Sequence, residues 1–197
     1  MSLKSTYTER YGHLNSNWRP RLEVDLSKRF ASAKHIERIS VRVKDIDRFI
    51  AKAETLIDGK KKYSDPINQI QDQIAARIVV LYLSDIAPIS DIVTEYFTGI
   101  EEKLIVPDAE KFGYFGKHFI LKVPTEVSKG EDGPLFFELQ IKTVFQHSWG
   151  EANHDLIYKT PTKLSNEQKR KVAFTAAQAW GADRIFDELY KELNPSS

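Results

Sequence analysis

The sequence predicts an α/β protein of the mixed α+β kind, in which helices flank a mixed β-sheet and a helical extension follows. Segments with strand-like and helix-like patterns alternate along the 197 residues. Hydrophobic residues make up 41% of the chain, which is enough for a packed core. We expect a single domain over residues 1–197, with its core at about 38–159, a helical segment at 1–37 and C-terminal helices at 160–197.

The composition excludes several classes of protein. The chain has 29 Lys and Arg residues against 28 Asp and Glu, so its net charge of +1 gives no overall attraction to nucleic acid or membranes. It has no cysteine, which excludes disulfides and thiolate zinc sites. No apolar run approaches the roughly 20 residues that span a bilayer, and the first residues lack the apolar core of a signal peptide. We expect a cytoplasmic protein without membrane contact.

The first third of the chain predicts a short strand between two helices. The first helix lies before position 38, and the strand follows at 39–43. After the strand, apolar residues recur at helical spacing and indicate a second helix. Asp45 has a side chain suited to cap the start of this helix, and Gly59 is suited to end it. The apolar positions of the second helix are Ile46, Phe49, Ile50 and Ala53.

The middle of the chain predicts a buried strand followed by a helix. A polar connection that contains Pro66 leads to the run AARIVVLYL at 75–83. Its continuous apolar, β-branched character is typical of a strand buried on both faces. The stretch DIAPISDIVTEYFTGI at 85–100 returns to helical spacing, with Ser90 and Asp91 near its start.

The last part predicts a hairpin and two helices. Strands at 113–123 and 135–143 flank a turn-rich loop, so we expect them to pair. Helices follow at 144–159 and 166–194, the second with a break near Gly181. Along the second strand, apolar and polar residues alternate, and by spacing alone the polar row is more often a solvated face than a site. The polar row is Glu138, Gln140 and Lys142.

Basic residues form the first candidate site. Arg42 and Lys44 lie on one face of the predicted strand, and Lys52 lies in the following helix. Three converging cations suit a polyphosphate, because phosphate oxygens bind best to charged donors. A solvated basic surface explains the same spacing and is the commoner case.

Two further groups are candidates for binding. Asp72 precedes the buried strand and Arg77 lies just inside it; the carboxylate suits a hard metal, and equally a turn or an ion pair. Tyr114, Gly116 and His118 share one strand face, where the tyrosine can stack on a base and the glycine can admit a ligand. By pattern alone, an ordinary hairpin is favoured.

In this order, the motifs resemble those of the RelA/SpoT-type alarmone synthetase domain. The family pattern is R-x-K with a further K eight residues later, D-x-x-[GA]-x-R, N-G-Y-x-S-x-H, E-[IL]-Q-I-[RK]-T, and a helix with W, E-H and Y-K. The resemblance covers roughly residues 38–159 and implies a nucleotidyltransferase-like synthetase fold. The matching residues are Arg42, Lys44, Lys52, Asp72, Ala75, Arg77, Gly113, Tyr114, His118, the run ELQIKT, Trp149, His154, Tyr158 and Lys159.

The resemblance implies a small stand-alone GTP diphosphokinase of the stringent response. Such an enzyme transfers a diphosphate from ATP to the 3′-hydroxyl of GDP or GTP, makes (p)ppGpp and releases AMP. On the ATP side, Arg42 and Arg77 would sandwich the adenine, while Lys44 and Lys52 would hold the phosphates.

The resemblance also implies the catalytic and acceptor residues. Asp72 and Glu138 would hold Mg²⁺, and Glu138 would activate the acceptor hydroxyl. Tyr114 would stack on guanine. The residues placed near the acceptor phosphates or the transferred group are His118, Gln140 and Lys142.

Departures from the family pattern lie mostly on the acceptor side. Phe112, Gly116 and Glu110 replace an asparagine, a serine and a lysine, and Asn153 and Lys142 replace a glutamate and an arginine. Two alternatives to GDP or GTP therefore stay open. One is a toxic small synthetase that pyrophosphorylates the 3′ end of tRNA, which would need a local basic surface such as 59–62 or 169–171. The other is a nucleotide-binding module with little or no turnover.

The family's small members often assemble through their terminal helices, which implies a homo-oligomer, either a tetramer or a dimer. The terminal helix carries apolar residues that could form such an interface or pack on the sheet of the same chain. They are Val172, Phe174, Ile185, Phe186 and Leu189.

Overall fold

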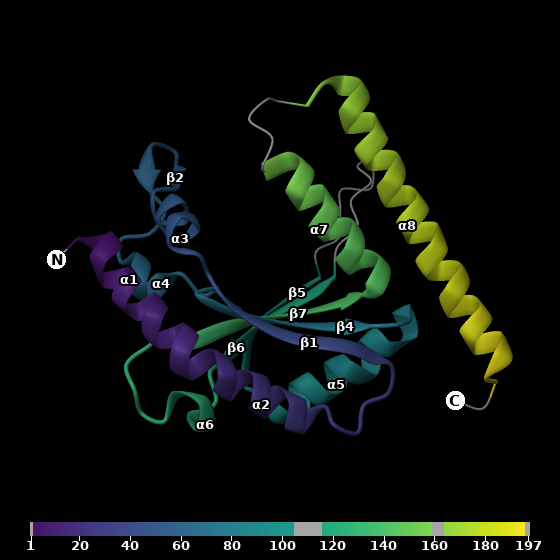
Figure 1. The fold of residues 1–197 in the computed structure, drawn as a ribbon, viewed down its shortest axis with the longest axis horizontal. Helices are drawn as coiled ribbons and strands as arrows, with labels where there is room; N and C mark the ends of the chain where they lie inside the picture. Colours follow the sequence, from purple (N-terminus) through teal and green to yellow (C-terminus); the bar gives the residue numbers. More distant parts are fainter. Residues whose placement is uncertain (1, 105–115, 159–163, 196–197) are drawn as a thin grey trace.

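The structure is a computed structural model that describes residues 2–104, 116–158 and 164–195. A central sheet has helices on both sides (Figure 1). In chain order, the elements are α1 (Leu3–His13), a π-helical turn η1 (Leu14–Trp18), α2 (Arg19–Arg29), β1 (Ile36–Val43), α3 (Ile46–Ala53), β2 (Leu56–Ile57), β3 (Lys60–Lys61), α4 (Pro66–Gln69), β4 (Ile74–Val80), a 3₁₀ turn η2 (Leu83–Asp85), α5 (Ile86–Tyr96), β5 (Gly99–Leu104), β6 (Lys117–Lys122), α6 (Thr125–Ser128), β7 (Phe136–Thr143), α7 (Val144–Tyr158) and α8 (Asn166–Leu193).

The main sheet has five strands in the order β1-β4-β7-β6-β5. The central pair β4 and β7 is parallel, and the other neighbouring pairs are antiparallel. The mixed sheet with flanking helices confirms the predicted fold class, and the β6–β7 pairing confirms the predicted hairpin. The strand β4 is buried along almost its whole length, as its apolar run predicts.

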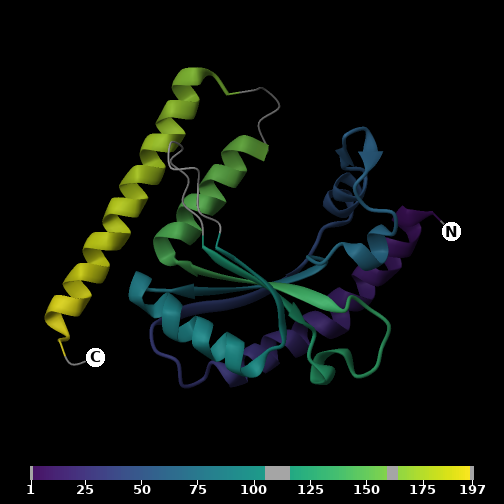
Figure 2. The ribbon, with the colours of Figure 1, turned by 180° about the vertical axis from the view of Figure 1, so that it is seen from behind.

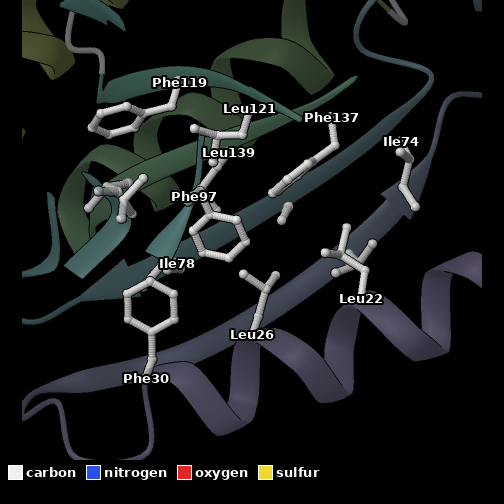
Figure 3. Packing of buried hydrophobic residues seen from close by; sticks show 14 of the residues in the cluster. Leu22, Leu26, Phe30, Ile74, Ile78, Phe97, Phe119, Leu121, Phe137 and Leu139 are labelled. Carbon is white, nitrogen blue, oxygen red and sulfur yellow. The ribbon is translucent and has the colours of Figure 1, made fainter. Parts of the chain in front are cut away.

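One face of the sheet forms the main hydrophobic core. Helices α2 and α5 cover this face, whereas α3, α7 and α8 lie on the other side (Figures 1 and 2). Figure 3 shows side chains of α2 pointing into the strands, with Leu22 and Leu26 near Phe97 and Phe137. Phe137 and its alternate neighbours Leu139 and Ile141 are fully buried in this core. The apolar row of β7 therefore faces the core, as its alternation predicts.

A smaller cluster lies under the start of the chain. Tyr7 of α1 stacks on Phe49 of α3, with ring centres 3.6 Å apart, and Ile70 packs beside them. The Asp45 carboxylate accepts hydrogen bonds from the backbone N–H groups of Asp47 and Arg48, so it caps α3 as predicted. No helix in the described ranges is both long and apolar enough to cross a membrane.

The end of α3 differs from the prediction. The helix ends at Ala53, and Gly59 lies in the turn of the small β2–β3 hairpin instead of stopping the helix. Asp58 and Gly59 both have positive φ, of 50° and 77°. Two successive positive φ values are what a tight two-residue hairpin turn requires, and an Asp-Gly pair is well suited to it.

The helix α5 begins at Ile86, with Ser90 near its start as predicted, and the Ser90 hydroxyl donates to the Ile86 carbonyl. Two other features differ from the prediction. Gly99, predicted within that helix, begins the strand β5. The long helix α8 runs unbroken through Gly181, because a single glycine weakens a helix by only about 1 kcal/mol.

Gly181 offers a test of helix stability. Apart from the adjacent residues and the nearby backbone of the same helix, a Cβ atom at this position would meet no atom within 4 Å. We expect Gly181→Ala to raise the free energy of unfolding by about 0.5–1 kcal/mol, because alanine loses less backbone entropy in a helix. Urea unfolding followed by circular dichroism measures this, and an unchanged or lower stability would contradict it.

Gly116→Ala is the contrasting variant. A Cβ at Gly116 would collide with the backbone carbonyl of Ile141 and with the side chain of Lys142. A backbone atom cannot move aside cheaply, so we expect a loss of about 1–3 kcal/mol in the same unfolding experiment.

Candidate active site on the polar face of the sheet

The pairing register aligns polar residues on the face of the sheet opposite the main core. Ser40 of β1 pairs with Arg77 of β4, Arg77 with Gln140 of β7, and Gln140 with His118 of β6. One row further, Arg42, Ala75, Glu138 and Ile120 are paired in the same way. The polar face lies between α3 with its hairpin and α7 (Figure 1). The sheet thus gathers residues that are far apart in the chain.

Asp72 forms the centre of the first cluster. Its Oδ2 atom accepts a hydrogen bond from Lys44 Nζ at 2.8 Å. The same oxygen forms an ion pair with Lys52 Nζ at 3.0 Å. Burial raises the pKa of Asp72, but the two ammonium groups outweigh burial and hold the pKa below its ordinary value. The other oxygen, Oδ1, is buried and has no hydrogen-bond partner among the described residues. Asp72 is therefore ionised, with one buried oxygen that no described residue contacts by a hydrogen bond.

Glu138 forms the second cluster. Its Oε1 atom lies 3.2 Å from His118 Nδ1, and its Oε2 atom accepts a hydrogen bond from Gln140 Nε2 at 2.9 Å. Burial raises the pKa of Glu138, but the contacts with His118 and Gln140 bring it below its ordinary value. The negative charge of Asp72 acts on Glu138 in the opposite direction, so the two carboxylates lie close enough to repel.

Asp72 and Glu138 line one cavity of about 310 Å³, together with Lys52 and His118. No group of three His, Cys, Asp or Glu side chains that could enclose a metal occurs in the described residues. Two ionised carboxylates fit Mg²⁺, which usually takes one or two carboxylates and completes its shell with water and phosphate oxygens. The buried, unpartnered Oδ1 of Asp72 is a suitable ligand atom, so the residues present fit this ion.

Arg77 connects the sheet to α7. Its Nε donates to Gln140 Oε1 at 3.2 Å, and its Nη1 donates to Glu151 Oε1 at 2.6 Å. The same Nη1 lies 3.0 Å from His147 Nδ1. Burial and the Arg77 charge lower the pKa of His147, which favours the neutral ring that can accept this hydrogen bond.

Sequence reasoning did not identify His147 and Glu151 as site residues. The available signal is their spacing of four residues in the helix that begins directly after the polar strand, which places both on one helix face. Trp149 lies between them in sequence and connects α7 to α8, with its Nε1 donating to Thr175 Oγ1 at 3.3 Å.

The predicted site residues have different surroundings. Tyr114 lies outside the described residues. Arg42 is exposed, whereas Gln140 is only 8% exposed and uses its amide on Arg77 and Glu138. Gly116 does not make room for a ligand, since a Cβ there would collide with β7; the glycine instead allows close packing of the chain on that strand.

Lys142 is a half-buried cation beneath α7. A Cβ built on Gly150 of α7 would lie 3.5 Å from Lys142 Nζ, so the helix passes directly over the amino group. Burial, with a smaller effect from the Arg77 charge, lowers the pKa of Lys142 to about 8.

Comparisons with known proteins identify a family and similar folds. The pattern described as "Region found in RelA / SpoT proteins" matches residues 41–163. GTP pyrophosphokinase YjbM from Bacillus subtilis (strain 168) is 24% identical over 163 residues, which cover 80% of this chain and 74% of that protein.

Solved structures have the same fold. Small alarmone synthetase 1 from Bacillus subtilis matches with a TM-score of 0.77 and 20% identity, over 98% of both chains. The same synthetase bound to its product pppGpp matches with a TM-score of 0.76 and 21% identity, over 95% of this chain and 96% of that one.

The lowered pKa of Lys142 predicts an unusual dependence of stability on pH. The folded pKa of about 8 lies below the ordinary value of 10.5, so the folded state disfavours the cation. Folding therefore gains stability as the pH rises between these two values. We expect the neutral variant Lys142→Gln to gain stability relative to wild type below pH 8, and this advantage to shrink between pH 8 and 10.5.

Urea unfolding across this pH range measures the difference between the two proteins. Lys61→Gln, on the exposed β3 strand, is the control and should show no such trend. A constant difference between wild type and Lys142→Gln at all pH values would contradict the prediction.

Proposed function

The chain belongs to the RelA/SpoT family, and from this premise we propose that it is a GTP diphosphokinase. It transfers a diphosphate from ATP to the 3′-hydroxyl of GDP or GTP, makes (p)ppGpp and releases AMP. The observation that carries the proposal is the pair of ionised carboxylates, Asp72 and Glu138, on one cavity with lysines beside them. The similarity to GTP pyrophosphokinase YjbM supports it, as does the similarity in fold to a synthetase structure that holds pppGpp.

The donor side is built for ATP. Arg42 and Arg77 lie on one face of adjacent strands, where their guanidinium groups would enclose the adenine. Bound by Asp72 and Glu138, Mg²⁺ would neutralise charge on the transferring diphosphate. Lys44 and Lys52 neutralise Asp72 in the free protein, and both would then contact the phosphates.

The transfer itself is a displacement at phosphorus. The 3′-oxygen of the acceptor forms a bond to the β-phosphorus of ATP, the bond from that phosphorus to the α-phosphate oxygen breaks, and AMP leaves. Glu138 accepts a hydrogen bond from the attacking hydroxyl and takes up its proton. His118 and Gln140 hold the Glu138 carboxylate in place from both oxygens.

On the acceptor side, we propose different roles for the four predicted residues. His118 and Gln140 position Glu138, since their contacts are already made within the protein. Lys142 supplies a cation to the acceptor phosphates, and Tyr114 stacks on guanine. The name of the relative and the pppGpp in the similar structure favour a free guanine nucleotide over the 3′ end of tRNA. Residues 1–197 would act as one synthetase unit in the cytoplasm, where these nucleotides occur.

The direct test offers labelled ATP with GDP, GTP or deacylated tRNA in separate reactions. We expect labelled (p)ppGpp and AMP with the guanine nucleotides, resolved by thin-layer chromatography. Transfer only to tRNA would replace this proposal with the alternative acceptor, and binding without any transfer would indicate a nucleotide-binding module.

We expect Asp72→Asn and Glu138→Gln each to lower Mg²⁺-dependent turnover about a hundredfold or more, the usual cost of losing a preorganised charged group. Each substitution preserves the shape of the side chain, so the folded state should persist by circular dichroism. Either variant retaining wild-type turnover at saturating Mg²⁺ would show that its carboxylate has no part in the reaction.

We also propose that α8 pairs with another copy of the chain. Several large apolar side chains on this helix are exposed: Phe174, Ile185, Phe186, Leu189 and Leu193. Such a row along a helix is typical of an association surface. Val172, in contrast, is half-buried against its own chain.

The double variant Ile185→Lys/Leu189→Lys should sediment as a monomer, because it places two charges in the apolar row. Glu95→Lys on α5 changes the net charge by the same amount away from α8, and it should leave the assembly intact. A double variant with the same sedimentation coefficient as wild type would contradict the proposed pairing.

A further inference from the structure

The β2–β3 hairpin and the residue after it carry three successive lysines that have no part in the proposed reaction so far. Lys60 and Lys61 form β3, and Lys62 follows directly. We propose that Lys62 is a further ligand for the phosphate chain of the nucleotide donor. This inference rests on the proposed function, because it places the donor in the cavity that Asp72 and Glu138 line.

Lys62 lines the same cavity as Asp72 and Glu138. Lys62 and Tyr63 line it on the side of the hairpin, across from His118 and Glu138 on the sheet. All three lysines are exposed, but Lys60 and Lys61 are not part of the cavity wall. Of the three successive lysines, therefore, Lys62 alone lines the cavity that the two carboxylates also line.

Lys62 is anchored by its backbone and by its neighbour Tyr63. Its backbone N–H donates to the Thr55 carbonyl at 2.9 Å, which closes the base of the hairpin on the end of α3. The next residue, Tyr63, packs against the small cluster that contains Phe49 and Ile70. Lys62 Nζ lies 5.3 Å from the centre of the Tyr63 ring, a cation–π distance. Lys62 is exposed, but its anchored backbone and its contact with Tyr63 restrict where its amino group can lie, which lowers the entropic cost of ordering it on a ligand.

The lysines near the cavity differ in whether a carboxylate already neutralises them. Lys44 and Lys52 both bind Asp72 in the free protein. Lys62 has no ion-pair partner within the described ranges, so its charge is not already neutralised. A triphosphate brings several negative charges into a cavity that already holds two carboxylates, and phosphate oxygens need charged donors. Lys62 can therefore contact the phosphates without first breaking an ion pair with a carboxylate, whereas Lys52, which also lines the cavity, is paired with Asp72.

The experiment compares Lys62→Gln with its neighbour Lys61→Gln, which removes the same charge from the same hairpin. Calorimetry measures the binding of the non-hydrolysable analogue α,β-methylene-ATP with Mg²⁺, and of AMP. We expect Lys62→Gln to weaken the triphosphate analogue about tenfold, or about 1.4 kcal/mol, and to leave AMP binding unchanged. Lys61→Gln should bind both ligands like wild type, and Lys62→Arg should retain most of the affinity because it keeps the charge.

Equal affinities of Lys62→Gln and Lys61→Gln for the triphosphate analogue would overturn the assignment. So would a parallel loss of AMP binding in Lys62→Gln, because that would indicate general disturbance of the site. If the hairpin instead binds a tRNA backbone, both variants should lose tRNA binding equally and keep the analogue, which again overturns the assignment.

The proposed function fails separately from the role of Lys62. Wild-type protein that binds the analogue but transfers nothing to GDP or GTP would end the proposed reaction, while a selective loss in Lys62→Gln would still establish the phosphate contact. Wild-type protein that does not bind the analogue would overturn both.

Discussion

The site depends on the register of β7 between β4 and β6. In this register Glu138, Gln140 and Lys142 face one side while Phe137, Leu139 and Ile141 are buried on the other. A slip by one residue would exchange the two faces, exposing three core side chains and burying three polar ones. The hydrophobic core therefore enforces the alignment of the polar row. The stability of the fold and the geometry of the site come from the same strand.

The N-terminal helices lie outside the family match, but they contact the segments that carry Lys44 and lead to Asp72. The match begins at residue 41, yet α1 and α2 precede it. The Tyr7 hydroxyl donates to the Lys44 carbonyl at 2.8 Å, directly beneath the lysine that pairs with Asp72. Arg10 donates to the Ile67 carbonyl at 3.0 Å, and so holds the segment that leads into Asp72.

The same N-terminal segment also binds the loop before β7 through hydrogen bonds to Glu131. Glu131 receives two hydrogen bonds from Arg21, at 2.8 and 2.9 Å, and one from Trp18 Nε1 at 3.0 Å. These bonds, led by those from Arg21, lower the pKa of Glu131 to about 2, so the contact stays ionised across the neutral range. The N-terminal helices are thus part of the scaffold that positions Lys44, Asp72 and β7.

Sequence reasoning succeeded where one local pattern determines the structure. The alternation in β7 and the apolar run in β4 each imply burial on known faces, and Asp45 is a local cap. At Gly181 it failed because a single glycine weakens a helix without being enough to end one of 28 residues. The strand β5 exists because it pairs with β6, which no local pattern near Gly99 reveals. The contact of Arg77 with His147 and Glu151 likewise depends on how α7 crosses the sheet.

Lys142 is a half-buried lysine on the polar face of the sheet. A half-buried lysine near Arg77 is unfavourable when charged, and its pKa of about 8 expresses that cost. A bound phosphate would favour the ammonium form and raise the pKa again, so ligand binding would be coupled to proton uptake near pH 8. An arginine here would stay charged with or without a ligand. In the proposed acceptor site, the lysine would instead make the local charge depend on a bound phosphate, whereas Asp72 and Glu138 stay ionised.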